Sequence, residues 1–371
     1  MLYMTSVLNR RLPSNGSRLL LVALLAFTLG CKAKKPVTPP FQPPTSAPEM
    51  REDASNQGEN LRNMAPTADP FRVGLFFPVT RDLQGNVQLS DAALDAMAGI
   101  MIAFDSLFRT GFRAEVQITI GSNQELEQLI SAEQLVLAFN KGNFEVYDSA
   151  HNYNTNPSMP DHMARLAKFW EKSKGPVFVV HQGTEIETAI AEAFLREDMP
   201  TAQMLQTDRF DLDFWREQLQ DSVANRIYLC SPNERYVTNI MRVLHELNEE
   251  FDIQVAGLPN WDRFATLQAD YLESSKTILT QSEYRLESSS LGNYVRSQYM
   301  THFAGEATAP VYKGFDHGMY FGRLLLQQVD PFKNYSFSTT DFEFVATDEN
   351  WLQNQAVRLI QFENYTFNLL P

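Results

Sequence analysis

The sequence predicts an α/β protein built of two lobes, each a parallel sheet with helices on both faces. Two observations lead to this prediction. From Phe71 onward, short apolar segments typical of strands alternate with longer amphipathic segments typical of helices. Of the 371 residues, 301 follow the first 70, which is enough for two domains of ordinary size. No internal repeat of solenoid period breaks the alternation.

The first part of the chain predicts three strands and two helices. In order, they are a strand at 73–79, a helix at 90–108, a strand at 114–121, a helix at 123–131 and a strand at 134–139. Ser90 is the expected N-cap of the first helix. Residues 141–161 predict a loop, because Asn and Pro residues interrupt every periodic pattern there.

The same alternation returns after this loop. Helices are expected at 162–174, 184–198, near 214–219, at 233–250, 289–303 and 314–329. Strands are expected at 176–183, 226–232, 251–259, 276–281 and 342–347, with 201–207 continuing the pattern and a hairpin at 357–370. Thr184 and Glu187 have the spacing of a capping box at the start of their helix.

The N-terminus predicts a secretory signal at residues 1–30. Arg10, Arg11 and Arg18 precede the apolar run 19–30. Twelve apolar residues span about 18 Å as a helix, which is too short for a bilayer core of about 30 Å. A basic region followed by a short apolar region is typical of a signal peptide rather than a transmembrane anchor.

The residues after this run predict lipid attachment and a tether. Residues 29–31, Leu-Gly-Cys, resemble the lipobox of bacterial lipoproteins, although Thr28 stands where Leu is usual. The resemblance implies that Cys31 carries acyl chains such as palmitate and anchors the chain on the periplasmic side of a Gram-negative envelope. No Asp follows Cys31, so the outer membrane is expected. Residues 31–70 are rich in proline and polar residues and predict a disordered tether.

Charge and cysteine content exclude other classes of function. The net charge is −14, and it becomes −17 once residues 1–30, with three Arg and no acid, are removed. This negative charge argues against a nucleic-acid partner. The chain has two cysteines, so Cys230 lacks a partner beside a lipidated Cys31 and is expected to be a buried apolar residue.

The chain shows no pattern that predicts catalysis or a cofactor. The opening strand and turn, 72–80, carry neither G-x-G-x-x-G nor a Walker lysine, which argues against a nucleotide. The six histidines form no H-x-x-x-H motif, so a metal is not expected. No G-x-S-x-G or S-x-x-K occurs with a plausible base. The acidic run 246–252 is expected to be a solvated face, and Trp261 a packing residue rather than a stacking platform.

Five segments in order resemble a known family. They are the opening strand 72–79, the helix 97–107, the unit 227–237, the segment Val255 to Phe264 with its Gly-Leu-Pro-Asn-Trp, and the Gly-Phe-Asp motif of 314–321. The chain resembles type I periplasmic binding proteins, in particular the amino-acid ABC transporter substrate-binding-like lipoproteins of Bacteroidota. The resemblance covers most of residues 72–330. It implies two Rossmann-like lobes around an interlobe cleft, with the ligand at the carboxyl ends of the strands.

The resemblance also implies a domain layout. Residues 71–160 are expected to form the first lobe, completed by part of 306–371, and residues 161–305 the second lobe. Residues 306–371 supply a crossover helix and a C-terminal hairpin. One family feature is missing: no strand–loop–strand is recognisable between Phe139 and His162. The first lobe is therefore expected to be shortened, with a wall of the cleft lost.

Candidate ligand-binding residues lie where the predicted strands end. They are Thr80, Arg81, Ser122, His181, Gln182, Ser231, Asn233 and Asp316. Asp316 is interpreted first as the N-cap of a helix at 318–328 and second as a carboxylate in the cleft.

Three functions remain open for this architecture. The main prediction is a non-enzymatic envelope lipoprotein that binds a small solute or a protein partner. The alternatives are an active amino-acid or peptide receptor for an ABC transporter and a regulator of a peptidoglycan synthase. Because a shortened first lobe captures solutes poorly, free amino acids are not expected to bind.

Overall fold

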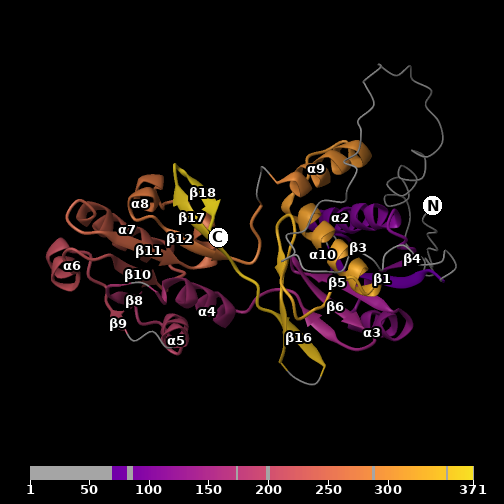
Figure 1. Ribbon diagram of the computed structural model, residues 1–371, viewed down its shortest axis with the longest axis horizontal. Helices are drawn as coiled ribbons and strands as arrows, with labels where there is room; N and C mark the ends of the chain where they lie inside the picture. Colours follow the sequence, from indigo (N-terminus) through magenta and orange to yellow (C-terminus); the bar gives the residue numbers. More distant parts are fainter. Residues whose placement is uncertain are drawn as a thin grey trace, which may run out of the picture.

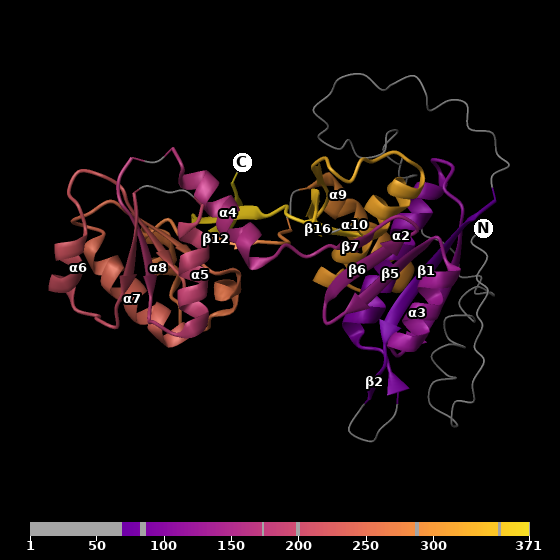
Figure 2. The same cartoon turned by 90° about the horizontal axis from the view of Figure 1, so that it is seen from below.

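The computed structural model describes residues 69–81, 87–172, 174–197, 201–285, 289–347 and 350–370, with only the backbone path at Thr80, Arg81, Val87 and Gln88. The predicted signal peptide, Cys31 and nearly all of the predicted tether lie outside these residues. The described chain forms two α/β lobes, which lie side by side and are joined by a narrow set of connections (Figures 1 and 2).

The first lobe is built on a seven-stranded sheet with the order β15-β16-β7-β6-β5-β1-β4. The strands are β1 (Phe71–Pro78), β4 (Ala114–Gly121), β5 (Leu135–Asn140), β6 (Asn143–Asp148), β7 (Asn152–Asn154), β15 (Phe344–Ala346) and β16 (Trp351–Asn354). The helices are α2 (Asp91–Phe108), α3 (Asn123–Ala132), α9 (Ser290–Phe303) and α10 (Ala309–Leu325). Two short ribbons complete it, β2 (Thr80–Arg81) with β3 (Val87–Gln88), and β13 (Tyr335–Ser336) with β14 (Asp341–Phe342).

The second lobe has a seven-stranded sheet of its own, with the order β18-β17-β12-β11-β10-β8-β9. The strands are β8 (Val177–His181), β9 (Ala202–Gln206), β10 (Asn225–Leu229), β11 (Ile253–Gly257), β12 (Ile278–Gln281), β17 (Arg358–Glu363) and β18 (Thr366–Leu369). The helices are α4 (Met159–Trp170), α5 (Glu185–Leu195), α6 (Leu212–Gln218), α7 (Glu234–Leu247), the 3-10 helix η1 (Pro259–Arg263) and α8 (Ala269–Ser274).

The central strands of each sheet, β1 and β5 in the first and β8, β10 and β11 in the second, are buried on both faces, as their apolar sequences predict. In the first lobe, Leu75 and Phe77 of β1 pack into a core shared with α2 and α10, whereas Phe76 faces a smaller cluster with Leu129 of α3. The helices α2 and α10 approach closely, because a Cβ added at Gly99 would lie 2.0 Å from the carbonyl oxygen of Val311. In the second lobe, Cys230 is fully buried in the core, as expected.

The sheets are mixed rather than fully parallel. Antiparallel pairs join β5, β6 and β7 in the first lobe and β12, β17 and β18 in the second. The chain crosses between the lobes three times, after β7, after β12 and after β16.

The prediction of a shortened first lobe is wrong. The residues expected to form a loop build β6 and β7, and the C-terminal part of the chain adds β15 and β16 beyond them. Lys141 and Gly142, both with positive φ, form a two-residue turn that pairs β5 with β6. The Asn residues on either side of this turn, Asn140 and Asn143, are paired strand residues rather than parts of a loop.

The helix α9 belongs to the first lobe, not to the second as the predicted boundaries placed it. Val295 is buried in the first lobe's core, and the hydroxyl of Tyr299 donates to Asp95 Oδ1 of α2 at 2.8 Å. The end of the chain is divided, since β15 and β16 join the first sheet whereas β17 and β18 join the second. Neither pairing follows from the local sequence.

Candidate functional site

Both sheets turn the carboxyl ends of their parallel strands toward the junction of the lobes. The three connections leave the carboxyl ends of β7 and β16 in the first lobe and of β12 in the second. Because β1 and β4 run in the direction of β7, and β8 and β10 in that of β12, the loops that follow them lie at these same edges. Polar side chains on these loops are the candidates for ligand contacts.

The structure brings four predicted residues together on the second lobe. Asn233 Nδ2 donates to Gln182 Oε1 at 3.2 Å, and its backbone N–H donates to Ser231 Oγ at 3.1 Å. His181 and Gln182 follow one another at the end of β8, and Cys230 N–H, next to Ser231, donates to the carbonyl oxygen of Val180 at 2.8 Å. The loops after β8 and β10 thus form one polar surface.

His181 and Ser231 are the buried members of this surface, and only His181 lacks hydrogen-bond partners among the described residues. The side chain of His181 is 1% exposed, and neither Nδ1 nor Nε2 has a hydrogen-bond partner among the described residues. A buried imidazole with two open nitrogen atoms carries a desolvation cost that a ligand or water can relieve. His181 is therefore the residue of this surface with the most unused hydrogen-bonding capacity.

A carboxylate that was predicted only as part of a capping box, and not as a site residue, holds the two loops together. Glu187, 1% exposed, accepts hydrogen bonds from the backbone N–H of Gln182 at 3.1 Å and of Thr184 at 3.2 Å, and from the hydroxyl of Ser231. Its capping box was recognisable in the sequence. Its burial and its bond to Ser231 were not, because they depend on how β8 and β10 pair.

The predicted residues of the first lobe are placed at the corresponding edge. Ser122 follows β4, is exposed, and uses its backbone N–H to bind Glu125 Oε2 at 2.9 Å. The backbone of Thr80 and Arg81 forms β2, which follows β1 directly and pairs with β3. Pro78 and Gly121 are register partners at the ends of β1 and β4. Thr80 and Arg81, which come after β1, and Ser122, which comes after β4, therefore belong to neighbouring segments.

Asp316 is not the N-cap of its helix, and its carboxylate is engaged in hydrogen bonds within the first lobe. Helix α10 begins at Ala309 behind the N-cap Thr308, so Asp316 lies in its interior and is fully buried. Its carboxylate accepts from the backbone N–H of Ser338, Thr339 and Thr340 at 2.8 to 3.1 Å, and from the hydroxyls of the first two. Burial raises the pKa of Asp316 to about 6, against the lowering effect of these bonds and of Arg358.

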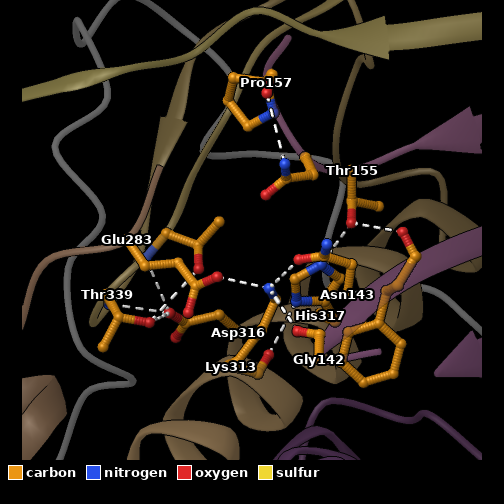
Figure 3. A network of polar contacts seen from close by, with 12 residues as sticks. Gly142, Asn143, Thr155, Pro157, Glu283, Lys313, Asp316, His317 and Thr339 are labelled. Carbon is orange, nitrogen blue, oxygen red and sulfur yellow. Dashed lines mark hydrogen bonds and ion pairs between the residues drawn. The ribbon is translucent and has the colours of Figure 1, made fainter. Parts of the chain in front are cut away.

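Asp316 belongs to a polar network at the junction of the lobes (Figure 3). Beside it, the ammonium group of Lys313 donates to the carbonyl oxygen of Gly142 at 2.8 Å, to Asn143 Oδ1 at 2.9 Å and to Glu283. Glu283 lies on the connection after β12 and is a bridge partner of Thr340. The network therefore joins this connection to α10 and to the tip of the β5–β6 hairpin.

His317 belongs to the same network and contacts Thr155 on the connection between the lobes that follows β7. Its Nδ1 donates to the carbonyl oxygen of Lys313 at 2.8 Å. The hydroxyl of Thr155 lies 2.9 Å from Nε2 and 2.7 Å from the carbonyl oxygen of Phe144, so these two acceptors share its proton. Burial and the charge of Lys313 lower the pKa of His317 to about 3, which keeps the ring neutral at neutral pH.

Arg358, the first residue of β17, joins the network at the end of the connection that follows β16. Its guanidinium donates to the carbonyl oxygens of Tyr284 at 2.6 Å and Phe337 at 3.1 Å, and to Asp341 Oδ1 at 2.5 Å. Each connection between the lobes thus meets a buried polar group. These groups are structural, because their hydrogen bonds lie within the protein.

The described residues contain no group of three or more His, Cys, Asp or Glu side chains arranged to hold a metal ion. In the described part of the chain, no helix combines the length and the apolar character needed to cross a bilayer. The hydroxyl of Ser231 donates to Glu187 and accepts from Asn233, so its hydrogen bonds connect the two loops. Trp261 is buried, and its indole N–H donates to the carbonyl oxygen of Ser231 at 3.2 Å, which makes it a packing residue, as expected.

No family model and no curated protein matches the chain, whereas solved structures with a similar fold do. A crystal structure from Rhodospirillum rubrum, described as a branched-chain amino acid ABC transporter, is similar over 81% of this chain and 100% of its own, with a TM-score of 0.56 and 12% identity.

Two further structures align with lower TM-scores. An ABC transporter substrate-binding protein from Desulfitobacterium hafniense in complex with Leu matches 81% of this chain and 100% of its own, at a TM-score of 0.45 and 11% identity. Full-length LpoA from Haemophilus influenzae matches 81% of this chain and 59% of its own, at 0.43 and 11%. The first similarity and the two-lobed topology show that the chain has the type I periplasmic-binding-protein fold.

Proposed function

We propose that the chain is a solute-binding receptor whose ligand, an amino acid or a short peptide, is held between the two lobes. The observation that carries the proposal is His181, a buried imidazole with two open nitrogen atoms on a polar loop surface at the carboxyl edge of a sheet. Ligands of open α/β sheets bind at this edge. The function is binding without catalysis.

The first lobe is large enough to form one wall of a cleft. The sequence predicted that a wall was lost, but the first lobe has a sheet of seven strands, the same number as the second. A two-lobed receptor holds its solute by closing both lobes over polar groups. Ser122, Thr80 and Arg81 stand at the edge of the first lobe where such contacts are needed.

We further propose that Cys31 is lipidated and that residues 31–70 tether the two lobes to the periplasmic face of the outer membrane. The support is the short apolar run before Cys31 and the proline-rich segment after it. Cell fractionation of a Cys31→Ser variant tests this proposal. The variant is expected in the soluble fraction, whereas the wild type takes up labelled palmitate; a variant that stays in the membrane pellet contradicts it.

A thermal-shift screen over amino acids, short peptides and muropeptides tests the receptor itself. A ligand at a hundred times its dissociation constant adds about 2.7 kcal/mol, which raises the Tm by several degrees. At least one amino acid or peptide is expected to do so, and the shift should decrease in His181→Asn. A shift by none of these solutes contradicts the receptor and favours the envelope-protein partner instead.

A further inference from the structure

The loops after β8 and β10 converge on Glu187 from two directions. Helix α5 contributes its first turn, in which Thr184 is the N-cap and Glu187 is the N3 residue. The loop after β10 contributes the hydroxyl of Ser231, and the loop after β8 contributes the backbone N–H of Gln182. All three partners of the carboxylate donate, which suits a carboxylate because it only accepts hydrogen bonds.

This donor set is the kind that binds an anion from solution. Backbone N–H groups at the start of a helix, together with a hydroxyl, favour carboxylates and phosphates because the N-terminal end of the helix dipole is positive. Here the anion is part of the chain. Glu187 is 1% exposed, so its carboxylate lies within the lobe.

Helix α3 has a capping box of the same kind, but in a different setting. Ser122 and Glu125 form the same capping box after β4 in the first lobe, but both residues are exposed. Glu187 has an additional donor, the Ser231 hydroxyl, from the loop after β10. Its charge acts inside the lobe, since it contributes, after burial, to raising the pKa of Cys230 and of Tyr236.

The loops around Glu187 carry a net negative charge, the same sign as a carboxylate. The segments 181–187, 207–213 and 231–235 contain six acidic and two basic residues. One of the two basic residues, Arg209, is paired with Asp211 at 2.7 Å. An incoming carboxylate would meet this acidic surrounding as well as donors that are already occupied.

We propose that Glu187 determines the specificity of the second lobe by occupying, from within, the donors that the carboxylate of a ligand would use. This lobe then accepts the neutral or cationic part of a solute, such as an ammonium group or an uncharged side chain, next to His181. The proposal rests on the receptor function stated above and deepens it.

Chemical rescue of Glu187→Ala tests the proposal without knowledge of the natural ligand. Removal of the side chain leaves three donors without an acceptor, so the Tm of the full chain is expected to fall by several degrees. Sodium acetate or formate at tens of millimolar should restore part of this loss, compared with sodium chloride at equal ionic strength. Adding Ser231→Ala to the same variant should reduce the rescue.

Matched variants keep the test decisive. Glu125→Ala removes the equivalent exposed carboxylate from α3, and acetate should shift its Tm no more than chloride does. Glu187→Gln fills the same space but presents an amide N–H₂ to donors, so it should lose stability that acetate does not restore. A Glu187→Gln variant as stable as the wild type contradicts the proposal even if Glu187→Ala does not fold.

Other outcomes separate this proposal from the receptor function. Absence of acetate rescue in a folded Glu187→Ala overturns the role of Glu187 and leaves the solute screen unaffected. A wild-type chain that binds acetate or formate saturably, with the effect lost in Ser231→Ala, also overturns it, because the donors would then be open to ligands. A failed solute screen with successful rescue contradicts the receptor alone.

Discussion

The ammonium group of Lys313, on α10 of the first lobe, forms an ion pair with Glu283, two residues beyond β12 of the second lobe. The lysine side chain is 7% exposed and that of Glu283 is 29% exposed. The pair therefore joins the lobes at a point from which water is largely excluded, where a charge needs its partner.

Breaking this pair is expected to destabilise the junction. Glu283→Gln and Lys313→Met should each cost about 2–3 kcal/mol, because each leaves a partly buried group without its partner. The double variant should recover part of the loss, with a coupling energy of about 1–3 kcal/mol in denaturant unfolding.

The pair Lys333–Asp330 provides the control for this cycle. Its atoms are 3.9 Å apart and the side chains are 70% and 47% exposed, so its coupling energy should stay below about 0.5 kcal/mol. Equal coupling for the two pairs would show that burial at the junction adds nothing.

Asp316 is expected to be essential for stability and unimportant for ligand binding. Asp316→Ala removes the acceptor of three backbone N–H groups and two hydroxyls, which should cost about 3 kcal/mol or more. Asp316→Asn keeps one acceptor oxygen and should cost less. Asp213→Ala, on a side chain that is 92% exposed, is the control. A change in the dissociation constant of a bound solute, without loss of stability, would restore Asp316 as a ligand residue.

The pH dependence of stability should carry the signature of buried histidines. Burial lowers the pKa of His162 to about 4, and burial with the charge of Lys313 lowers that of His317 to about 3, against 6.5 for an ordinary histidine. The unfolded chain therefore binds protons that the folded chain does not, and stability present above pH 6.5 is lost as the pH falls toward 4. Asp316 acts in the opposite sense, since its pKa is raised from 3.8 to about 6.

These opposing contributions give a measurable slope. Near pH 5 the two histidines together take up about two protons on unfolding and Asp316 releases about one, so on the order of 1 kcal/mol of stability should be lost for each unit by which the pH falls. His317→Gln removes one of these protons, and its stability between pH 6 and 4.5 should be nearly flat by comparison. Unfolding curves at several pH values that give the same slope for both proteins would contradict the buried, neutral histidine.

The contact between α2 and α10 should not tolerate a methyl group at Gly99. A Cβ there would lie 2.0 Å from the carbonyl oxygen of Val311, so Gly99→Ala must separate the helices and should cost about 2 kcal/mol or more. At Gly305 the nearest atom to an added Cβ is 3.6 Å away, and Gly305→Ala should change stability by less than about 0.5 kcal/mol. Similar Tm values for the two variants would contradict this packing.

The fold could be predicted wherever the sequence pattern is local. The alternation of strands and helices was correct for β1, α2, β4 and α3, since each has its own periodicity and caps. The β6 strand was missed because Gly142 lies in its hairpin turn and Asn140 and Asn143 flank that turn, and these residue types also mark loops. The lobe to which α9 belongs depends on contacts between residues as far apart as Asp95 and Tyr299, which no local pattern contains.

The part of the candidate site at the strand ends was predicted, because those strands have a local sequence pattern. Parallel pairing of β8 and β10 brings together the residues at their ends, His181, Gln182, Ser231 and Asn233. Asp316 was misplaced because α10 is buried on all sides from Val311 to Gly322, so the amphipathic pattern that marks where a helix begins is lacking.

Binding between the lobes is tested most directly by calorimetric titration of one solute, selected by the thermal-shift screen, into the wild-type chain and into one variant from each lobe. Binding to the wild type is expected to be saturable. Both His181→Asn in the second lobe and Arg81→Ala in the first are expected to weaken it at least tenfold, because the ligand lies between the lobes. An affinity that neither variant changes, or the absence of heat from any selected solute, would contradict a receptor that binds between its two lobes.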